Sequence, residues 1–407
     1  MIHKKWKKDY LTGSEFFKTP FVKTLSPMLT KIRPLALYLH IPYCLEKCPY
    51  CDFHSIAVSS SEIPYQDYAD CLMAQMKQEV ARLALQNREL VSIFFGGGTP
   101  SLMTPHFFRQ VLSAAASHFN FKSDIEITVE SNPATVCAKN FKEWLAIGIN
   151  RVSFGVQSFQ NPLLKKLGRN HSAAQAKEGL QMSLDAGFEN VSCDLIFGME
   201  GESLKELEED LRQAISFNLP HMSAYQLTVE SGTPLASSVK QGLYRLPEED
   251  ILVAMHEKVS QTFESHGWHR YEVSNYAKPG FQSRHNLQYW RYEEYLGIGS
   301  GAVSSVANKR WRTTRKLKDY LNKQWNFEEE ETLDAKTALK EKWMMGLRLQ
   351  EGLPLKMGDR RWERAFLKME EEGLLRQSDE KIQVTQKGFL VLNRITQNVF
   401  DLIDQMC

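Results

Sequence analysis

The 407-residue sequence has no long apolar run, no internal repeat, no low-complexity segment and almost no net charge. Since no run approaches the roughly 20 apolar residues of a membrane-spanning helix, we expect no transmembrane segment. The 50 Lys and Arg residues nearly balance the 49 Asp and Glu residues, which argues against a nucleic-acid-binding protein. The basic start, MIHKKWKKDY, is not followed by the apolar stretch of a secretory signal. These absences together predict a cytoplasmic protein.

Cysteine is scarce and unevenly placed, because three of the seven cysteines lie within eight residues. Such spacing does not suit a disulfide framework, and in a reducing compartment a tight cluster more often binds metal. We therefore assign Cys44, Cys48 and Cys51 to a metal site. Free cysteine is among the most buried residue types, so the isolated four are expected to be buried, unreactive thiols. They are Cys71, Cys137, Cys193 and Cys407.

Short runs of β-branched and aromatic residues alternate with amphipathic stretches along the first part of the chain. The six runs are 36–42, 91–95, 126–130, 151–157, 191–198 and 222–229. Stretches between them, such as 68–86 and 203–217, carry apolar residues three and four apart, as helices do. This alternation predicts an α/β fold with a parallel sheet. Because six repeats fall short of the eight of a closed barrel, we expect an open partial (β/α)6 barrel.

Residues that could bind a ligand or take part in a reaction lie where these runs end. The cysteine loop follows the first run, Gly96–Thr99 the second, and Glu130 ends the third. Gln157 ends the fourth, and Asp194 lies inside the fifth. Such folds build their sites at the carboxyl ends of the strands, so the sequence predicts one functional rim.

The alternation stops near residue 240. Residues 246–267 predict one helix, and 374–392 predict a hairpin plus helix within a winged-helix-like tail. The expected parts are a basic arm at 1–34, the barrel at 35–240, an α+β region at 241–335 and the tail at 336–407. The arm is either loosely packed or a contact for an acidic partner or membrane surface.

The loop Cys44-Leu-Glu-Lys-Cys48-Pro-Tyr-Cys51 offers three soft thiolates, which select zinc or an iron–sulfur cluster. Structural zinc takes four ligands, and His54 could supply the fourth. In the other reading, three thiolates on a [4Fe–4S] cluster leave one iron open to a ligand.

The segment YLHIPYCLEKCPYCDF (38–53) resembles the radical S-adenosylmethionine superfamily. The branch that it resembles contains the oxygen-independent coproporphyrinogen dehydrogenases and the HemW heme chaperones. The resemblance implies that S-adenosylmethionine chelates the open iron of a [4Fe–4S] cluster, which could cleave it to a 5′-deoxyadenosyl radical. The implied contacts to this ligand are Tyr38, Tyr50, Gly97, Gly98, Thr99, Glu130, Gln157, Arg169 and Asp194.

The glycine run, Glu130 and Asp194 each have a plainer alternative. The glycine run could be only a turn, Glu130 a surface charge, and Asp194 a buried carboxylate with a structural partner. One departure from the family is Glu200, where relatives commonly have proline, and we expect it to change only the stiffness of its loop.

Three features favour the chaperone branch. Phe53 stands where the dehydrogenases typically have a further cysteine, and the N-terminal arm has no match to theirs. Residues 285–290, HNLQYW, match the HNxxYW signature that the resemblance connects with heme binding. Imidazole is a common heme ligand and aromatic rings can cover a porphyrin edge, so His285 is the candidate heme contact. By motif alone, such a histidine could equally be a packed core residue.

The resemblance therefore implies a heme chaperone that binds heme and transfers it to an unidentified acceptor protein. No catalytic residue is assigned, because the cluster and S-adenosylmethionine would then be structural or regulatory. The alternative is oxidative decarboxylation of coproporphyrinogen III by the dehydrogenase reaction. A third hypothesis, nucleic-acid binding by the tail, is disfavoured because acidic residues 370–372 offset its basic residues.

Overall fold

The computed structural model describes residues 34–354, 360–378 and 380–405. The chain divides into two units, Met1–Arg33 and Pro34–Cys407, and the described fold belongs to the second. The expectations for the basic arm and for Cys407 lie outside the described residues.

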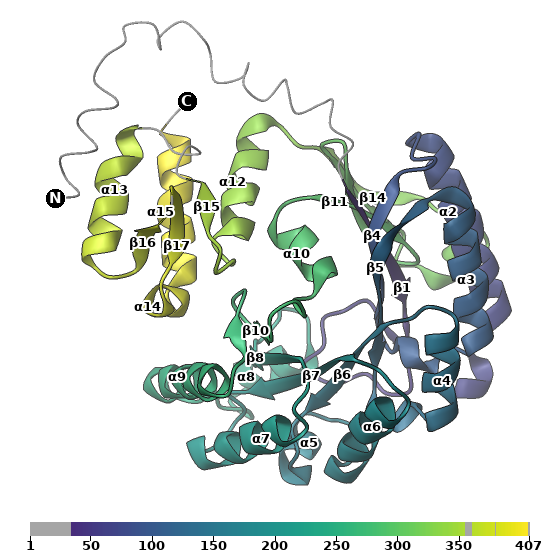
Figure 1. The fold of residues 1–407 in the computed structure, drawn as a ribbon, viewed down its shortest axis with the longest axis horizontal. Helices are drawn as coiled ribbons and strands as arrows, with labels where there is room; N and C mark the ends of the chain where they lie inside the picture. The colour runs from purple at the N-terminus through teal and green to yellow at the C-terminus, as the bar shows by residue number, and fades with distance from the viewer. Residues whose placement is uncertain (1–33, 355–359, 379, 406–407) are drawn as a thin grey trace, which may run out of the picture. The chain divides into compact units, whose positions relative to one another are not determined.

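Six parallel strands form the centre of a 12-stranded sheet, in the order β1-β4-β5-β6-β7-β8 (Figure 1). They are β1 (Leu35–Ile41), β4 (Glu89–Gly97), β5 (Asn120–Ser131), β6 (Arg151–Gln157), β7 (Asn190–Phe197) and β8 (His221–Gln226). All six coincide with the predicted runs. Because the described sheet has two ends rather than closing on itself, the prediction of an open partial barrel is confirmed.

Helices that follow the strands cover the outer face of this sheet (Figure 1). They are α2 (Tyr65–Arg82), α3 (Pro105–His118), α4 (Ala138–Ala146), α5 (Asn161–Lys166), α6 (Ala173–Asp185) and α7 (Leu204–Ser216). Capping boxes at Ser172 and Ser203 begin α6 and α7 by satisfying backbone N–H groups. The main core lies between helices and sheet, where Trp144 packs edge-on against Phe108 and Phe141. Each large apolar side chain buried there contributes about 1.5–3 kcal/mol.

Strands from the second half of the chain extend the sheet at both ends, which the sequence did not predict. β11 (Glu294–Ile298) pairs in parallel with β1, and β12 (Val303–Val306), β13 (Lys309–Thr313) and β14 (Phe327–Thr332) follow it. At the other end, β10 (Asn275–Ala277) and β9 (His269–Arg270) continue from β8. Pairing in this way covers the backbone groups that an edge strand leaves open. The boundary proposed at residue 240 stays a prediction.

The remaining short elements connect these parts. They are β2 (Tyr43–Cys44), β3 (Ile56–Ala57), α8 (Pro234–Lys240), α9 (Glu249–Ser265), α10 (Arg284–Trp290), α11 (Leu317–Leu321) and three 3₁₀ turns, Ser60–Glu62, Pro100–Leu102 and Pro133–Thr135. The helix predicted at 246–267 is α9, and α10 lies on the inner side of the sheet (Figure 1). Within the described ranges, no helix is long and apolar enough to cross a membrane.

The C-terminal elements have a separate core and the winged-helix-like order expected from the sequence. They are α12 (Ala335–Gly346), β15 (Leu353–Pro354), α13 (Arg360–Glu371), β16 (Leu375–Ser378), β17 (Lys381–Val384), α14 (Gln386–Leu390) and α15 (Leu392–Asp404). β16 and β17 form the predicted hairpin, and β15 adds a third strand to it. Trp343 and Trp362 pack together at the centre of this core.

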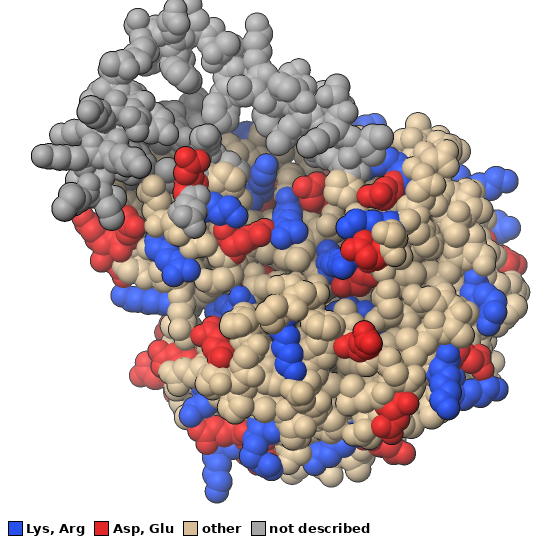
Figure 2. Space-filling model, viewed as in Figure 1, with Lys and Arg blue, Asp and Glu red and all other residues tan. Residues whose placement is uncertain are grey.

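Two of the three isolated cysteines that the structure describes are buried. Cys71 and Cys193 are buried, as predicted, but Cys137 is exposed, so that prediction was wrong. Cys137 is exposed because it caps the start of α4 and points its thiol to Asn140 rather than into the core. On the face shown in Figure 2, acidic and basic side chains are interspersed, as the balanced composition indicates.

Candidate cluster and ligand site

The cysteine loop begins where β2 ends and presents three thiols at the carboxyl rim of the sheet. Cys44 is buried, whereas Cys48 and Cys51 are half-buried, and the Cys51 amide donates to the Cys48 carbonyl over 3.1 Å. The hydroxyl of Thr99 donates to Cys44 Sγ over 3.4 Å, and Arg169 Nη1 donates to Cys48 Sγ over 3.5 Å. Burial raises the pKa of the Cys44 and Cys51 thiols, and the hydrogen bond from Thr99 opposes that rise at Cys44. Three sulfur ligands in one loop are the kind that a soft metal binds as thiolates. The donor set therefore fits a soft metal site.

His54 does not complete a zinc site with these cysteines. Its Nε2 shares a hydrogen bond of 3.2 Å with Ser300 Oγ, and its ring stacks on that of His40. Across the described residues, no group of three or more His, Cys, Asp or Glu side chains is arranged to hold a single metal ion. A four-iron cluster places its three thiolates on different irons, so the loop suits the cluster better than the zinc reading.

The glycine segment packs directly against this loop. The Gly98 amide donates to the Ile41 carbonyl over 2.7 Å, and the Thr99 amide donates to the Tyr43 carbonyl over 2.8 Å. Gly97 has a φ of +111°, and a Cβ there would lie 2.5 Å from the imidazole of His40. Only glycine meets both requirements without strain. This segment is therefore more than a solvent-exposed turn.

Glu130 faces inward from the end of β5 and is not a surface charge. Its Oε2 accepts a hydrogen bond from the Gly97 amide over 3.1 Å. Burial raises the pKa of Glu130 to about 7, and the Gly97 amide and the nearby Arg151 oppose that rise. The carboxyl group can therefore exchange a proton near neutral pH and accept hydrogen bonds from a ligand.

Arg169 lies beside the cysteine loop, and the Gln157 side chain lies near Gly155, whose carbonyl accepts from Arg169. Gln157 ends β6 with a φ of +67°, a conformation that costs a non-glycine residue about 1 kcal/mol or more and often marks functional positions. Arg169 Nη2 donates to the Gly155 carbonyl over 3.0 Å, which holds its guanidinium toward Cys48. Tyr50 packs against a small apolar cluster that includes Leu163. The contacts of these three residues to S-adenosylmethionine remain a prediction.

Asp194 is held by three serine hydroxyls. Ser153 donates to Oδ2 over 2.8 Å, while Ser192 and Ser223 donate to Oδ1 over 2.8 and 2.6 Å. The carboxylate therefore has the structural partners that the plainer reading expected. It also lines a cavity, so a contact to the ligand stays a prediction.

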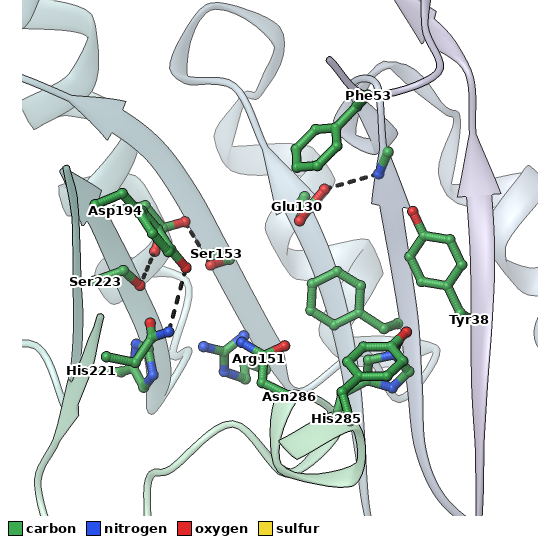
Figure 3. A pocket seen from close by; sticks show the side chains of 15 residues that line it. Tyr38, Phe53, Glu130, Arg151, Ser153, Asp194, His221, Ser223, His285 and Asn286 are labelled. Atoms are coloured by element: carbon green, nitrogen blue, oxygen red, sulfur yellow. Dashed lines mark hydrogen bonds between the residues drawn. The ribbon is translucent and has the colours of Figure 1, made fainter. Parts of the chain in front are cut away.

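Two adjoining cavities open next to the rim. The inner cavity, of about 260 Å³, is lined by Tyr38, Phe53, Phe94, Gly97, Glu130, Arg151, Ser153, Asp194, His221, Ser223, Tyr225, Asn275, His285, Asn286 and Tyr289 (Figure 3). The outer pocket, of about 530 Å³, is lined by Tyr38, His40, Lys47, Asp52, Phe53, His54, Tyr289, Tyr295, Gly301, Val303, Arg312 and Arg315. Tyr38, Phe53 and Tyr289 belong to both linings, so the two spaces lie next to each other on either side of these residues.

His285 is a buried residue on α10 whose two ring nitrogens both have partners. Ser92 Oγ and His285 Nδ1 share a hydrogen bond of 2.9 Å, and Nε2 shares another of 2.9 Å with the Tyr289 hydroxyl. Burial lowers the pKa of His285 to about 3, so the imidazole is neutral. The carboxylate of Glu126 accepts from the His285 amide over 3.0 Å and fixes the start of the helix. Heme ligation by His285 remains a prediction.

The sequence did not single out four polar residues that line the inner cavity. They are Arg151, His221, Ser223 and Asn275. Arg151 begins an otherwise apolar strand, and a charged residue at such a position was a usable signal. The other three give no local signal, because β8 and β10 bring them to the cavity through long-range pairing.

Comparison with known proteins places the chain in a family. Residues 38–214 match the Radical SAM superfamily, and residues 333–391 match the HemN C-terminal domain. The chain is 41% identical to the heme chaperone HemW of Haemophilus influenzae over 308 residues, which is 74% of this chain and 79% of that protein. It is 42% identical to HemW of Escherichia coli over 290 residues (71% and 75%), and 33% identical to HemW of Bacillus subtilis over 371 residues (88% and 97%).

The fold has a solved counterpart. Coproporphyrinogen III oxidase (HemN) from Escherichia coli aligns with a TM-score of 0.76 over 99% of both chains, at 19% sequence identity. At this identity the likeness shows a shared fold and nothing about the reaction. Taken with the relatives above, the chain belongs to the HemW heme chaperone family of the radical SAM superfamily.

Proposed function

We propose that this protein is a heme chaperone, which binds heme and transfers it to an acceptor protein. In this proposal Cys44, Cys48 and Cys51 hold a [4Fe–4S] cluster, and S-adenosylmethionine binds exchangeably beside it. The observation that carries the proposal is the outer pocket, in which aromatic rings and cations meet next to the cysteine loop. The HemW relatives support the same function through the family.

The outer pocket has the chemistry that a tetrapyrrole requires. Tyr38, Phe53, Tyr289 and Tyr295 offer aromatic surface for a flat macrocycle, and Phe53 is 61% exposed. Lys47, Arg312 and Arg315 surround the same space and can bind propionates by charge-assisted hydrogen bonds. We keep His285 as the proposed heme contact. His285 lines the inner cavity and not the outer pocket, and Tyr289, which lines both, occupies its Nε2. Ligation to an iron in the outer pocket therefore requires that the Tyr289 side chain move out of the way.

The rim can hold the cluster and its ligand with residues already in place. When bound, a [4Fe–4S] cluster supplies an open iron for the amino and carboxylate groups of S-adenosylmethionine and, when reduced, an electron. Thr99 and Arg169 donate to the cysteine sulfurs. Glu130 offers its free oxygen to a ribose hydroxyl or an ammonium group. Through these contacts the protein can hold S-adenosylmethionine beside the cluster, whether or not S-adenosylmethionine is cleaved.

The test uses the full chain with its cluster reconstituted anaerobically. Titration with heme should give a saturable Soret change at one heme per chain, and apomyoglobin added afterwards should take up the heme. A parallel incubation with S-adenosylmethionine, a reductant and coproporphyrinogen III should give no decarboxylated porphyrinogen. Failure to bind heme overturns the proposal. Formation of the decarboxylated product would replace it with the dehydrogenase function.

A further inference from the structure

Arg151 is a buried cation inside the partial barrel. It is the first residue of β6 and is only 1% exposed, yet its side chain lines the inner cavity. In Figure 3 its guanidinium lies between His221 on one side and Asn286 and His285 on the other. An arginine at this depth normally has a carboxylate partner, because an unpaired buried charge is costly.

No such partner exists among the described residues. The side chain of Arg151 makes no hydrogen bond or ion pair with any of them, and its Nε is fully buried without an acceptor. Arginines elsewhere in the barrel region behave differently, since Arg82 pairs with Glu79 at 2.6 Å and Arg88 with Glu294 at 2.9 Å. The buried Arg169 also lacks a carboxylate partner but donates to Cys48 Sγ and to the Gly155 carbonyl, whereas the Arg151 side chain has no hydrogen-bond partner among the described residues.

Neither acidic group of the cavity forms an ion pair with Arg151, although Glu130 lies near enough for the arginine charge to oppose the rise of its pKa. Glu130 binds the Gly97 amide, and both oxygens of Asp194 accept from serine hydroxyls. His221 is also satisfied, because its nitrogens share hydrogen bonds with Ser192 and Tyr271 at 2.7 and 2.8 Å. The guanidinium is thus left without a hydrogen-bond partner among the described residues, in a cavity whose lining shares Tyr38, Phe53 and Tyr289 with the outer pocket.

We propose that Arg151 is the receptor for a ligand carboxylate that reaches the inner cavity from the outer pocket. This inference rests on the proposed function, because the carboxylate that the geometry favours is a propionate of heme. The inner cavity is too small for the macrocycle but can admit one of its arms. The planar guanidinium matches a carboxylate with two parallel hydrogen bonds. The carboxylate of S-adenosylmethionine is the second possible source, and the experiment separates the two.

The experiment compares the wild-type chain with Arg151→Gln and Arg151→Lys, and uses the exposed Arg212→Gln as control. Dissociation constants are measured for heme, for the dimethyl ester of heme and for S-adenosylmethionine. Losing one partner of a buried charge pair typically weakens binding by roughly 30-fold or more. We expect Arg151→Gln to weaken heme binding by that factor. Wild type should prefer heme to its diester, and Arg151→Gln should show a smaller preference, because Lys47, Arg312 and Arg315 remain to bind a propionate in the outer pocket.

Each other outcome also decides the matter. Weaker binding of S-adenosylmethionine with unchanged heme binding supports the carboxylate receptor and assigns S-adenosylmethionine as the source. Unchanged affinity for both ligands overturns the proposal. If wild type binds no heme, the proposed function fails, while the S-adenosylmethionine measurements still test Arg151 on their own.

Thermal unfolding of the ligand-free variants guards against a purely structural role. Since a receptor held ready for a ligand costs stability, Arg151→Gln should unfold at the same temperature as wild type or above it. The receptor role is overturned if two results occur together. The first is an unfolding temperature of Arg151→Gln several degrees below that of wild type. The second is that Arg151→Lys regains heme affinity only in proportion to the stability that it regains.

Discussion

His285 Nε2 and the Tyr289 hydroxyl share a hydrogen bond of 2.9 Å within one turn of α10. Ser92 occupies the other ring nitrogen, so the histidine that the motif offers as a heme ligand has no free nitrogen in this conformation. Two residues of the HNxxYW segment, His285 and Tyr289, are thus hydrogen-bonded to each other inside the partial barrel. Binding of iron to His285 must compete with the Tyr289 hydroxyl.

Replacing Tyr289 by phenylalanine tests that competition. Tyr289→Phe keeps the aromatic ring and removes the hydroxyl, and a hydrogen bond of this kind contributes about 0.5–1.5 kcal/mol net. We expect heme to bind roughly 3- to 10-fold more tightly, with a Soret spectrum shifted toward histidine ligation. The double variant with His285→Ala should lose the gain. If Tyr289→Phe and His285→Ala both match wild type in spectrum and affinity, His285 is a packing residue.

Single cysteine substitutions test the cluster assignment. Cys44→Ser, Cys48→Ser and Cys51→Ser should each lose most of the iron and the visible absorbance after reconstitution, because serine is a poor ligand for this soft site. Cys137→Ser removes an exposed thiol outside the loop and should retain both. Iron and sulfide analysis of the four proteins decides the assignment, and full iron in any loop variant contradicts it.

Gly97→Ala should destabilise the rim. The added methyl group would meet the His40 ring at 2.5 Å in a backbone conformation with a φ of +111°. The conformation alone costs about 1 kcal/mol or more, and displacement of His40 adds to it. Gly267→Ala is the matched control, since its φ is +90° and nothing lies within 4 Å of the added Cβ. Chemical denaturation should show a larger loss for Gly97→Ala, and equal losses would show that the contact with His40 is unimportant.

Glu272 predicts a pH dependence of stability. This carboxyl is fully buried, accepts from the Asn275 side chain, and has its pKa raised by burial to about 7. The folded state therefore holds a proton that the unfolded state releases near its ordinary pKa of about 4.3. The contribution of this group to stability is greatest below that value and falls as the pH rises toward 7, by on the order of 2–3 kcal/mol. Buried histidines with lowered pKa values, such as His40 and His285, contribute the opposite slope, so the difference between wild type and a Glu272 variant is the quantity to measure.

Glu272→Gln should flatten that fall, because glutamine has no proton to release. Glu202 and Glu130 also have pKa values raised to about 7 by burial, so part of the slope should persist. Urea unfolding between pH 5 and pH 8 measures the slope, and Glu371→Gln serves as a surface control. A slope as steep in Glu272→Gln as in wild type would show that Glu272 is ionised in the folded protein.

Local patterns in the sequence determined a large part of this protein. Alternating strands and helices predicted the six parallel strands, because burial on two faces imposes near-continuous apolar runs that are readable locally. The positions of Cys44, Glu130 and Asp194 at one rim followed from the rule that parallel strands end together. Even so, the pattern suggested only possible roles for Glu130 and Asp194.

The tertiary structure decided what the patterns left open. The pairing of β11 with β1 joins residues more than 250 positions apart, and such long-range pairing has no local signature. The same pairing brings α10 into the barrel, where His285 finds Ser92 and Tyr289. Arg151 likewise has no ion-pair partner among the described residues. The local sequence could not show this, because the distance from Arg151 to each carboxylate depends on the assembled cavity. The sequence therefore determined the cysteine loop and the strands, whereas the fold decided which polar groups have hydrogen-bond partners and which, like Arg151, have none among the described residues.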